Sequence, residues 1–274
     1  MLEDGNPKLP GGLRVFSGAV IVVLLVGAGL FFVPDMVKPR WPWLLAPFNA
    51  RFLGSFYLAE LVAMVALLVW NRWSPARMIL VMAFVFTLVV SVTSLINLDQ
   101  FNFGRKASWL WFVVYAGSAI VSGLFLWNAR GTPPVVAAMS GAGWRRYFQA
   151  EAVVLGLYGL GLLILPATFS AFWSWKIDAF HAQTYSAIFI TAAAGTWLIS
   201  AHAPREELVA LGAAQLALGL LSIIGLVLTD AVVKRVDWSA PGTWAWLLLF
   251  AAIAVTGLIK LRGGLARVST AALA

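Results

Sequence analysis

Eight long apolar stretches, separated by short polar segments, dominate the pattern of the chain. A helix needs about 20 mostly apolar residues to cross the hydrocarbon core of a bilayer, and each stretch is of that order. They run approximately from Val15 to Val33, Phe52 to Trp70, Met78 to Asn97, Trp109 to Trp127, Phe148 to Phe169, Thr184 to Ser200, Leu208 to Thr229 and Thr243 to Leu261. Because they lack the alternation of barrel strands, we expect an all-α integral membrane protein of about eight transmembrane helices.

Composition agrees with a lipid environment. Of the 274 residues, 62% are hydrophobic and 11% are charged, whereas a soluble domain is about half apolar and a quarter charged. The net charge is +8, but no basic run is long enough to follow phosphates, so we expect the lipid bilayer and no nucleic acid as a partner. The absence of cysteine excludes thiolate nucleophiles and cysteine-bound clusters, and no cofactor is predicted.

The distribution of Lys and Arg between the apolar stretches predicts the orientation. If the termini and the second, fourth and sixth loops share one side, that side carries eleven of these cations and the other side carries eight. Cytoplasmic loops are the richer in Lys and Arg. We therefore expect a multi-pass protein of the cell membrane, a bacterial inner membrane, with both termini in the cytoplasm.

The two halves of the chain resemble each other. When the chain is shifted by 132 residues, the segment from Arg14 to Tyr57 aligns without a gap with the segment from Arg146 to Phe189. Identities include the rarer residue types, for example Pro34 with Pro166. This self-similarity predicts two parallel four-helix repeats, related by a pseudo-twofold axis along the membrane normal: residues 1–132, a cytoplasmic linker at 133–147, and residues 148–274.

The loop after the first helix of each half is long and rich in aromatic residues. These loops contain Trp41 and Trp43 in the first half, and Trp173 and Trp175 in the second. Tryptophan is enriched where helices meet the headgroup region, so one interpretation is an aromatic anchor on the non-cytoplasmic side. The alternative is a lid over a binding cavity in each half.

Charged side chains accompany both aromatic loops. If the loops are lids, Arg51 would lie at the mouth of the first cavity, and Asp178 with His181 at the mouth of the second.

The string WPWLLAPFNARFLGSFY, residues 41–57, resembles a loop pattern of uncharacterised multi-pass bacterial membrane proteins. The resemblance covers about 17 residues and implies no known activity. The second half departs from the pattern, because Ser174 replaces the central proline and Gln183 stands where the first half has Arg51.

Glu60 is the candidate functional carboxyl within an apolar stretch. A carboxylate in the membrane is energetically costly and is therefore a functional hypothesis by default. Tyr57 shares its helix face, and the aligned residue of the second half is Ala192. Glu60 could couple to a proton or a cation, or it could be a structural group bonded to a Ser or Thr of a neighbouring helix.

Other polar residues fit structural roles. Gln215 lies between Gly212 and Gly219, a pattern typical of close helix packing. His181 and His202 are 21 residues apart, about 31 Å along a helix, so they cannot share a metal ion and no metal site is predicted.

Three classes of function remain open. The first is binding or transport of a small solute, a lipid or an apolar molecule within or between the halves, at Glu60 and the aromatic loops. The second is a non-catalytic scaffold or accessory subunit, with a membrane-protein partner or a second copy of the chain. A membrane enzyme is the least favoured, because no acid pair, Ser–His arrangement or metal cluster falls at one depth.

Overall fold

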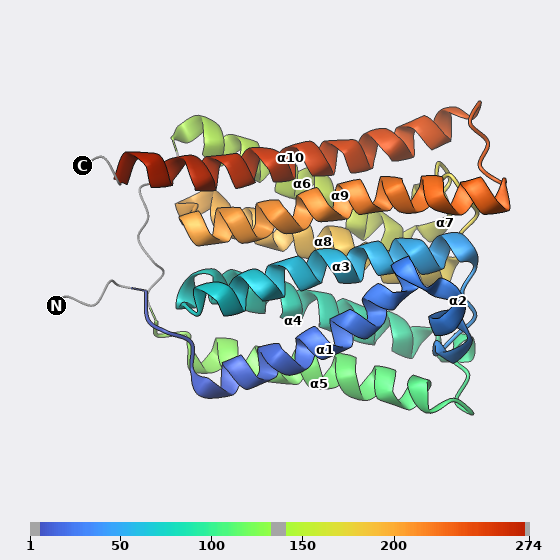
Figure 1. Cartoon of the computed structure of the whole chain (residues 1–274), viewed down its shortest axis with the longest axis horizontal. Coiled ribbons are helices and arrows are strands. Elements are labelled where there is room, and N and C mark those ends of the chain that lie inside the picture. Colours follow the sequence, from blue (N-terminus) through green and yellow to red (C-terminus); the bar gives the residue numbers. More distant parts are fainter. Residues whose placement is uncertain (1–5, 133–140, 272–274) are drawn as a thin grey trace.

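The chain folds as a bundle of long helices in the computed structural model, which describes residues 6–132 and 141–271 (Figure 1). Within these ranges, eight helices are long and apolar enough to cross a membrane. They are α1 (Gly11–Phe32), α3 (Pro47–Trp70), α4 (Trp73–Ile96), α5 (Lys106–Asn128), α6 (Ala142–Ile164), α8 (Ala179–His202), α9 (Arg205–Val233) and α10 (Pro241–Ala271). The predicted multi-pass, all-helical membrane fold is confirmed.

Successive long helices run in opposite directions, so the connections alternate between the two ends of the bundle (Figure 1). One end carries the first and last described residues and the short links between α3 and α4 and between α8 and α9; we call it the terminal end. The loop end, opposite, carries the connections between α1 and α3, α4 and α5, α6 and α8, and α9 and α10. These contain the short helices α2 (Pro34–Val37) and α7 (Pro166–Phe169) and the 3₁₀ turns η1 (Lys38–Arg40) and η2 (Leu98–Gln100).

Several helices extend beyond their apolar stretches. α3 begins at Pro47 and not near Phe52, and α6 begins at Ala142, inside the predicted linker 133–147. Hydropathy identifies only the part of a helix that can lie in the hydrocarbon core of the bilayer. The helical backbone hydrogen bonds continue beyond that part. Residues 133–140 of the linker lie outside the described residues.

Helices α3 and α8 form the centre of the bundle. More than half of the residues in their membrane-spanning windows are buried, against a third or fewer in the other six. α3 packs along α1 and α9, and α8 packs along α6 and α4, while α5 lies on α4 and α10 on α9. The outer helices present exposed apolar side chains such as Val15, Leu110 and Leu248, as expected for surfaces that face lipid.

The absence of cysteine allows a direct test of the alternating topology. Ala171 and Gly131 are exposed and lie at opposite ends of the bundle. We expect single variants Ala171→Cys and Gly131→Cys to react with a membrane-impermeant maleimide from opposite sides of sealed vesicles. Labelling of both from the same side would contradict the eight-helix topology.

Candidate functional site

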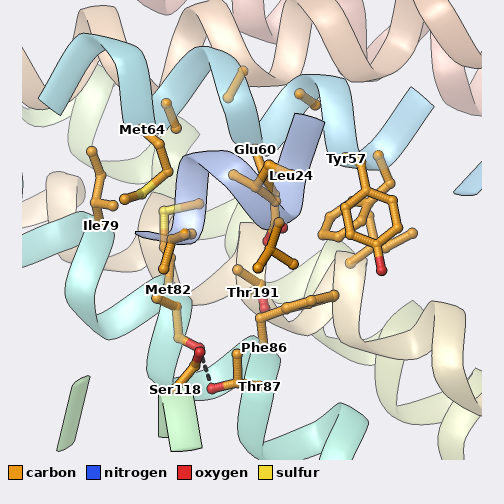
Figure 2. A pocket seen from close by; sticks show the side chains of 18 of the residues that line it. Leu24, Tyr57, Glu60, Met64, Ile79, Met82, Phe86, Thr87, Ser118 and Thr191 are labelled. Atoms are coloured by element: carbon orange, nitrogen blue, oxygen red, sulfur yellow. Dashed lines mark hydrogen bonds between the residues drawn. The ribbon is translucent and has the colours of Figure 1, made fainter. Parts of the chain in front are cut away.

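A cavity of about 300 Å³ lies inside the bundle, between the central helices and the outer helices of the first half. Its walls come from α1, α3, α4, α5, α8 and α9, and most of its lining is apolar (Figure 2). Ala or Gly occupies several lining positions where a larger side chain would fill the space. These are Ala19, Ala59, Ala63, Ala83, Gly117, Ala192 and Ala214.

Glu60 is the acidic residue of this cavity. It lies thirteen residues after the first residue of α3 and ten before the last, close to the middle of the helix, and it is therefore deeper than a helix start near Phe52 predicts. Figure 2 shows its side chain pointing away from the α3 ribbon, toward the other lining side chains. Within the described residues, its carboxyl has no hydrogen bond or ion pair. The alternative role, a structural carboxyl hydrogen-bonded to a Ser or Thr of a neighbouring helix, is therefore not observed.

Tyr57 lines the cavity one helical turn from Glu60, as the sequence predicted for their shared face. Its hydroxyl is 2.6 Å from the hydroxyl of Tyr115 on α5, which also lines the cavity. The two hydroxyls satisfy each other, so they join α3 to α5 and leave the Glu60 carboxyl without a partner from this pair.

The cavity reaches the outer surface between α1 and α5. Ala19 on α1 and Val113 on α5 both line it, and both are exposed. Nearer the terminal end, Phe16 of α1 and Phe125 of α5 close this gap, with ring centroids 6.3 Å apart. The opening therefore faces the surface that the bilayer covers.

A buried ionic cluster, which sequence reasoning missed, lies behind the cavity. The Lys260 ammonium on α10 donates to both carboxylate oxygens of Glu151 on α6, at 2.6 and 2.5 Å, and to Oε1 of Gln215 on α9, at 2.8 Å. The Gln215 amide also donates to Glu151 at 3.1 Å, and Lys260 is only 1% exposed. Gln215 belongs to the cavity wall as well, so it connects the cluster to the cavity.

This cluster changes two interpretations. Lys260 is one of the eleven cations counted on the side of the termini, but it is an interior residue of α10, so it does not contribute to the loop charge bias. Glu151 is nine residues inside α6 and therefore also lies in the membrane-spanning part, so the bundle holds another interior acid besides Glu60, which the sequence pattern does not single out. In the hydropathy pattern both fall at the ends of apolar stretches, because their own charges lower the local hydropathy. The sequence signal that could have identified this pair is that the two opposite charges lie just inside the same-side ends of their apolar stretches.

Trp41 and Trp43 do not line the cavity but form an aromatic cluster at the loop end. Both are buried, at 7% and 3% exposure, and both pack edge to face on Trp111 of α5. Nε1 of Trp43 donates to Nε2 of His181 at 3.1 Å. These rings therefore tie the first aromatic loop to α5 and α8 and do not project from the bundle.

Trp173 and Trp175 form a matching cluster with Phe52 of α3 and Trp246 of α10. Nε1 of Trp175 donates to Oδ1 of Asn49 on α3 at 2.7 Å. Thus each aromatic loop is hydrogen-bonded to the first turn of a central helix from the other half.

Asp178 and His181 are brought together, at the beginning of α8. Asp178 caps the helix by accepting from the backbone N–H of His181, and its carboxylate lies 2.8 Å from Nδ1 of the same residue. Because Trp43 can only donate, Nε2 of His181 accepts and Nδ1 carries the proton. Partial burial raises the pKa of Asp178, but the hydrogen bonds from the ring and the backbone N–H of His181 outweigh it and hold that pKa below its ordinary value.

Arg51 lies apart from both the cavity and the Asp178–His181 pair. Its guanidinium donates to the carbonyl of Phe31 at 2.8 Å, near the end of α1. A cation that binds the last carbonyls of a helix stabilises that end. The structure therefore places Arg51 at the α1–α3 junction.

The predicted site residues thus separate into a cavity group, Glu60 and Tyr57, and loop-end groups around the tryptophans. Among the described residues, no three His, Asp or Glu side chains are close enough to hold a metal ion. No family model matches the chain, and searches of curated proteins and solved structures found no significant match.

Proposed function

We propose that this membrane protein binds a small apolar solute or a lipid in the central cavity, as a carrier or binding protein. The observation that carries the proposal is the cavity itself, with the unpaired Glu60 carboxyl facing it. Ligand pockets are mainly apolar, with a few polar groups that orient the ligand. This cavity has that composition, and an intramembrane carboxyl without a protein partner marks a ligand or ion pathway.

The position of the opening supports an apolar ligand. Ala19 and Val113 lie at the exposed edge of the cavity, between two helices whose outer faces are apolar. A molecule dissolved in the bilayer could therefore enter sideways without crossing a polar surface. Entry from the aqueous side at the loop end would have to pass the buried aromatic clusters.

The proposal includes two parallel four-helix repeats, one of α1, α3, α4 and α5 and the other of α6, α8, α9 and α10. Helix packing supports it, since the contacts of α3 with α1 and α9 correspond to those of α8 with α6 and α4. The α4–α5 and α9–α10 pairs correspond as well.

Reciprocal hydrogen bonds between the halves support the same arrangement. Trp43 binds His181, and Trp175 binds Asn49. Trp43 and Trp175 are 132 residues apart, and so are Asn49 and His181. A twofold axis between the halves would generate such an exchange of partners.

With an even number of spans in each repeat, both termini lie on one side. The surplus of cationic loop residues at the terminal end supports placing that side in the cytoplasm and the chain in the cell membrane.

Filling the cavity tests the proposed function. A side chain at Gly117 would meet no atom within 4 Å of its Cβ, and Gly117 lines the cavity. We expect Gly117→Leu to weaken binding by about tenfold or more, equivalent to at least about 1.4 kcal/mol, because the leucine occupies ligand space. The probe is 1-hydroxyadamantane, a compact apolar cage, measured by equilibrium dialysis of the protein in nanodiscs with empty nanodiscs as the blank.

The matched control is Gly18→Leu. Gly18 also lies in a membrane-spanning helix with open space at its Cβ, but it is not part of the cavity wall. Binding to this variant should equal that of the wild type. If Gly117→Leu binds this probe as well as Gly18→Leu does, the cavity is not the binding site.

A further inference from the structure

The two halves of the bundle treat an interior carboxyl differently, and this difference points to the chemistry of the ligand. In the second half, the Glu151 carboxylate holds the Lys260 ammonium, with the Gln215 amide beside it. In the first half, Glu60 faces a cavity with no cation among the described residues that line it. One carboxyl thus has an internal ammonium partner, and the other has space.

Both carboxyls lie in one layer of the bundle. Glu60 is ten residues from the terminal end of α3, Glu151 is nine from that end of α6, and Gln215 is ten from that end of α9. At 1.5 Å per residue these distances are about 14 to 15 Å. The partners of Glu151 therefore show which groups satisfy a buried carboxylate at the depth of Glu60.

The sequence alignment explains why only the first half is open. At the shift of 132 residues, Glu151 corresponds to Ala19, which lies at the lateral opening. The Lys260–Glu151 pair joins α10 to α6. The equivalent outer helices, α5 and α1, have no such bridge among the described residues, and they leave the cavity accessible.

Resting on the proposed function, we infer that the cavity binds an amine: an apolar molecule whose single ammonium group takes at Glu60 the place that Lys260 takes at Glu151. A carboxylate removed from water requires a cationic or hydrogen-bonding partner. The Lys260 ammonium also lies 5.5 Å from the centre of the Phe148 ring. Aromatic rings are likewise available in the cavity, from Phe56, Tyr57 and Phe86, and ring faces attract cations.

The test compares two probes of the same shape, 1-aminoadamantane and 1-hydroxyadamantane, in nanodiscs at neutral pH. The amine is charged and the alcohol is neutral, while the apolar cage is identical. We expect the wild type to bind the amine about tenfold or more tightly than the alcohol, because a hydrogen bond to a charged partner is stronger than a neutral one. Glu60→Gln should remove this preference and retain alcohol binding.

Two further variants complete the design. Met64→Lys introduces an ammonium in the cavity wall, one helical turn from Glu60 on the same helix. This internal cation should pair with Glu60, as Lys260 pairs with Glu151 from a neighbouring helix, and should reduce amine binding to the level of the alcohol. Glu206→Gln removes a carboxylate outside the cavity, in the first turn of α9, and should retain the full preference.

The outcomes separate the inference from the proposed function. Equal binding of the two probes to the wild type, or an amine preference that survives both Glu60→Gln and Met64→Lys, would overturn the amine inference and leave the cavity as an apolar site. Binding of neither probe to the wild type would overturn the proposed function itself. A preference that is lost in both cavity variants and kept in Glu206→Gln supports both.

Discussion

We expect Lys260→Met to destabilise the protein more than any other single substitution considered. Lys260 is 1% exposed, and its ammonium is bound by Glu151 and Gln215. Removal of one partner of a buried ion pair leaves an uncompensated charge in a medium of low polarity, at a cost of about 3 to 5 kcal/mol. The free energy of unfolding, measured by steric trapping in bicelles, should fall by this amount.

The control is the double variant Glu151→Gln/Lys260→Met, which removes both charges. The neutral amide introduced at position 151 can then bind the amide of Gln215, so we expect the double variant to be more stable than Lys260→Met alone. If the single and double variants were equally stable, the side chain of Lys260 would contribute through packing and not through its charge.

The second large effect is expected at the contact between α9 and α10. A Cβ on Gly257 would lie 2.4 Å from the backbone nitrogen of Leu216 and 2.7 Å from the carbonyl oxygen of Gly212. Backbone atoms cannot move away as a flexible side chain can, so Gly257→Leu must separate the helices. We expect a loss of about 3 kcal/mol, the upper part of the usual range for overpacking, measured by the same unfolding assay.

Gly263→Leu on the same helix provides the comparison. A Cβ there would meet no atom within 4 Å, and its stability should remain within about 0.5 kcal/mol of the wild type. Equal losses in the two variants would mean that helix propensity or lipid contact, and not the α9–α10 approach, determines the effect.

Glu60 illustrates how far sequence reasoning about the site could go. A charged residue among some twenty apolar ones is visible in the sequence, and so is the neighbouring Tyr57 on the same face. The empty space in front of Glu60 is not visible, because it depends on small side chains from helices far apart in the chain, such as Gly117 and Ala192.

For the tryptophans of the two aromatic loops, the sequence suggests a surface role and the structure shows burial. Their abundance in two aligned loops is plain in the sequence and suggests an anchor or a lid. The fold instead buries Trp41 and Trp43 against α5 and joins Trp43 to His181, more than a hundred residues away. A hydropathy pattern cannot give this result, since tryptophan suits a headgroup interface and a packed interior equally well.

The sequence by itself determined the number of membrane helices, because about 20 consecutive apolar residues with internally satisfied backbones have few other stable forms. It also identified the interior carboxyl of Glu60. Only the tertiary structure decided which carboxyl is paired and which faces a cavity. That choice depends on how each helix is rotated about its axis and which helix lies beside it, and these are set by packing between distant segments.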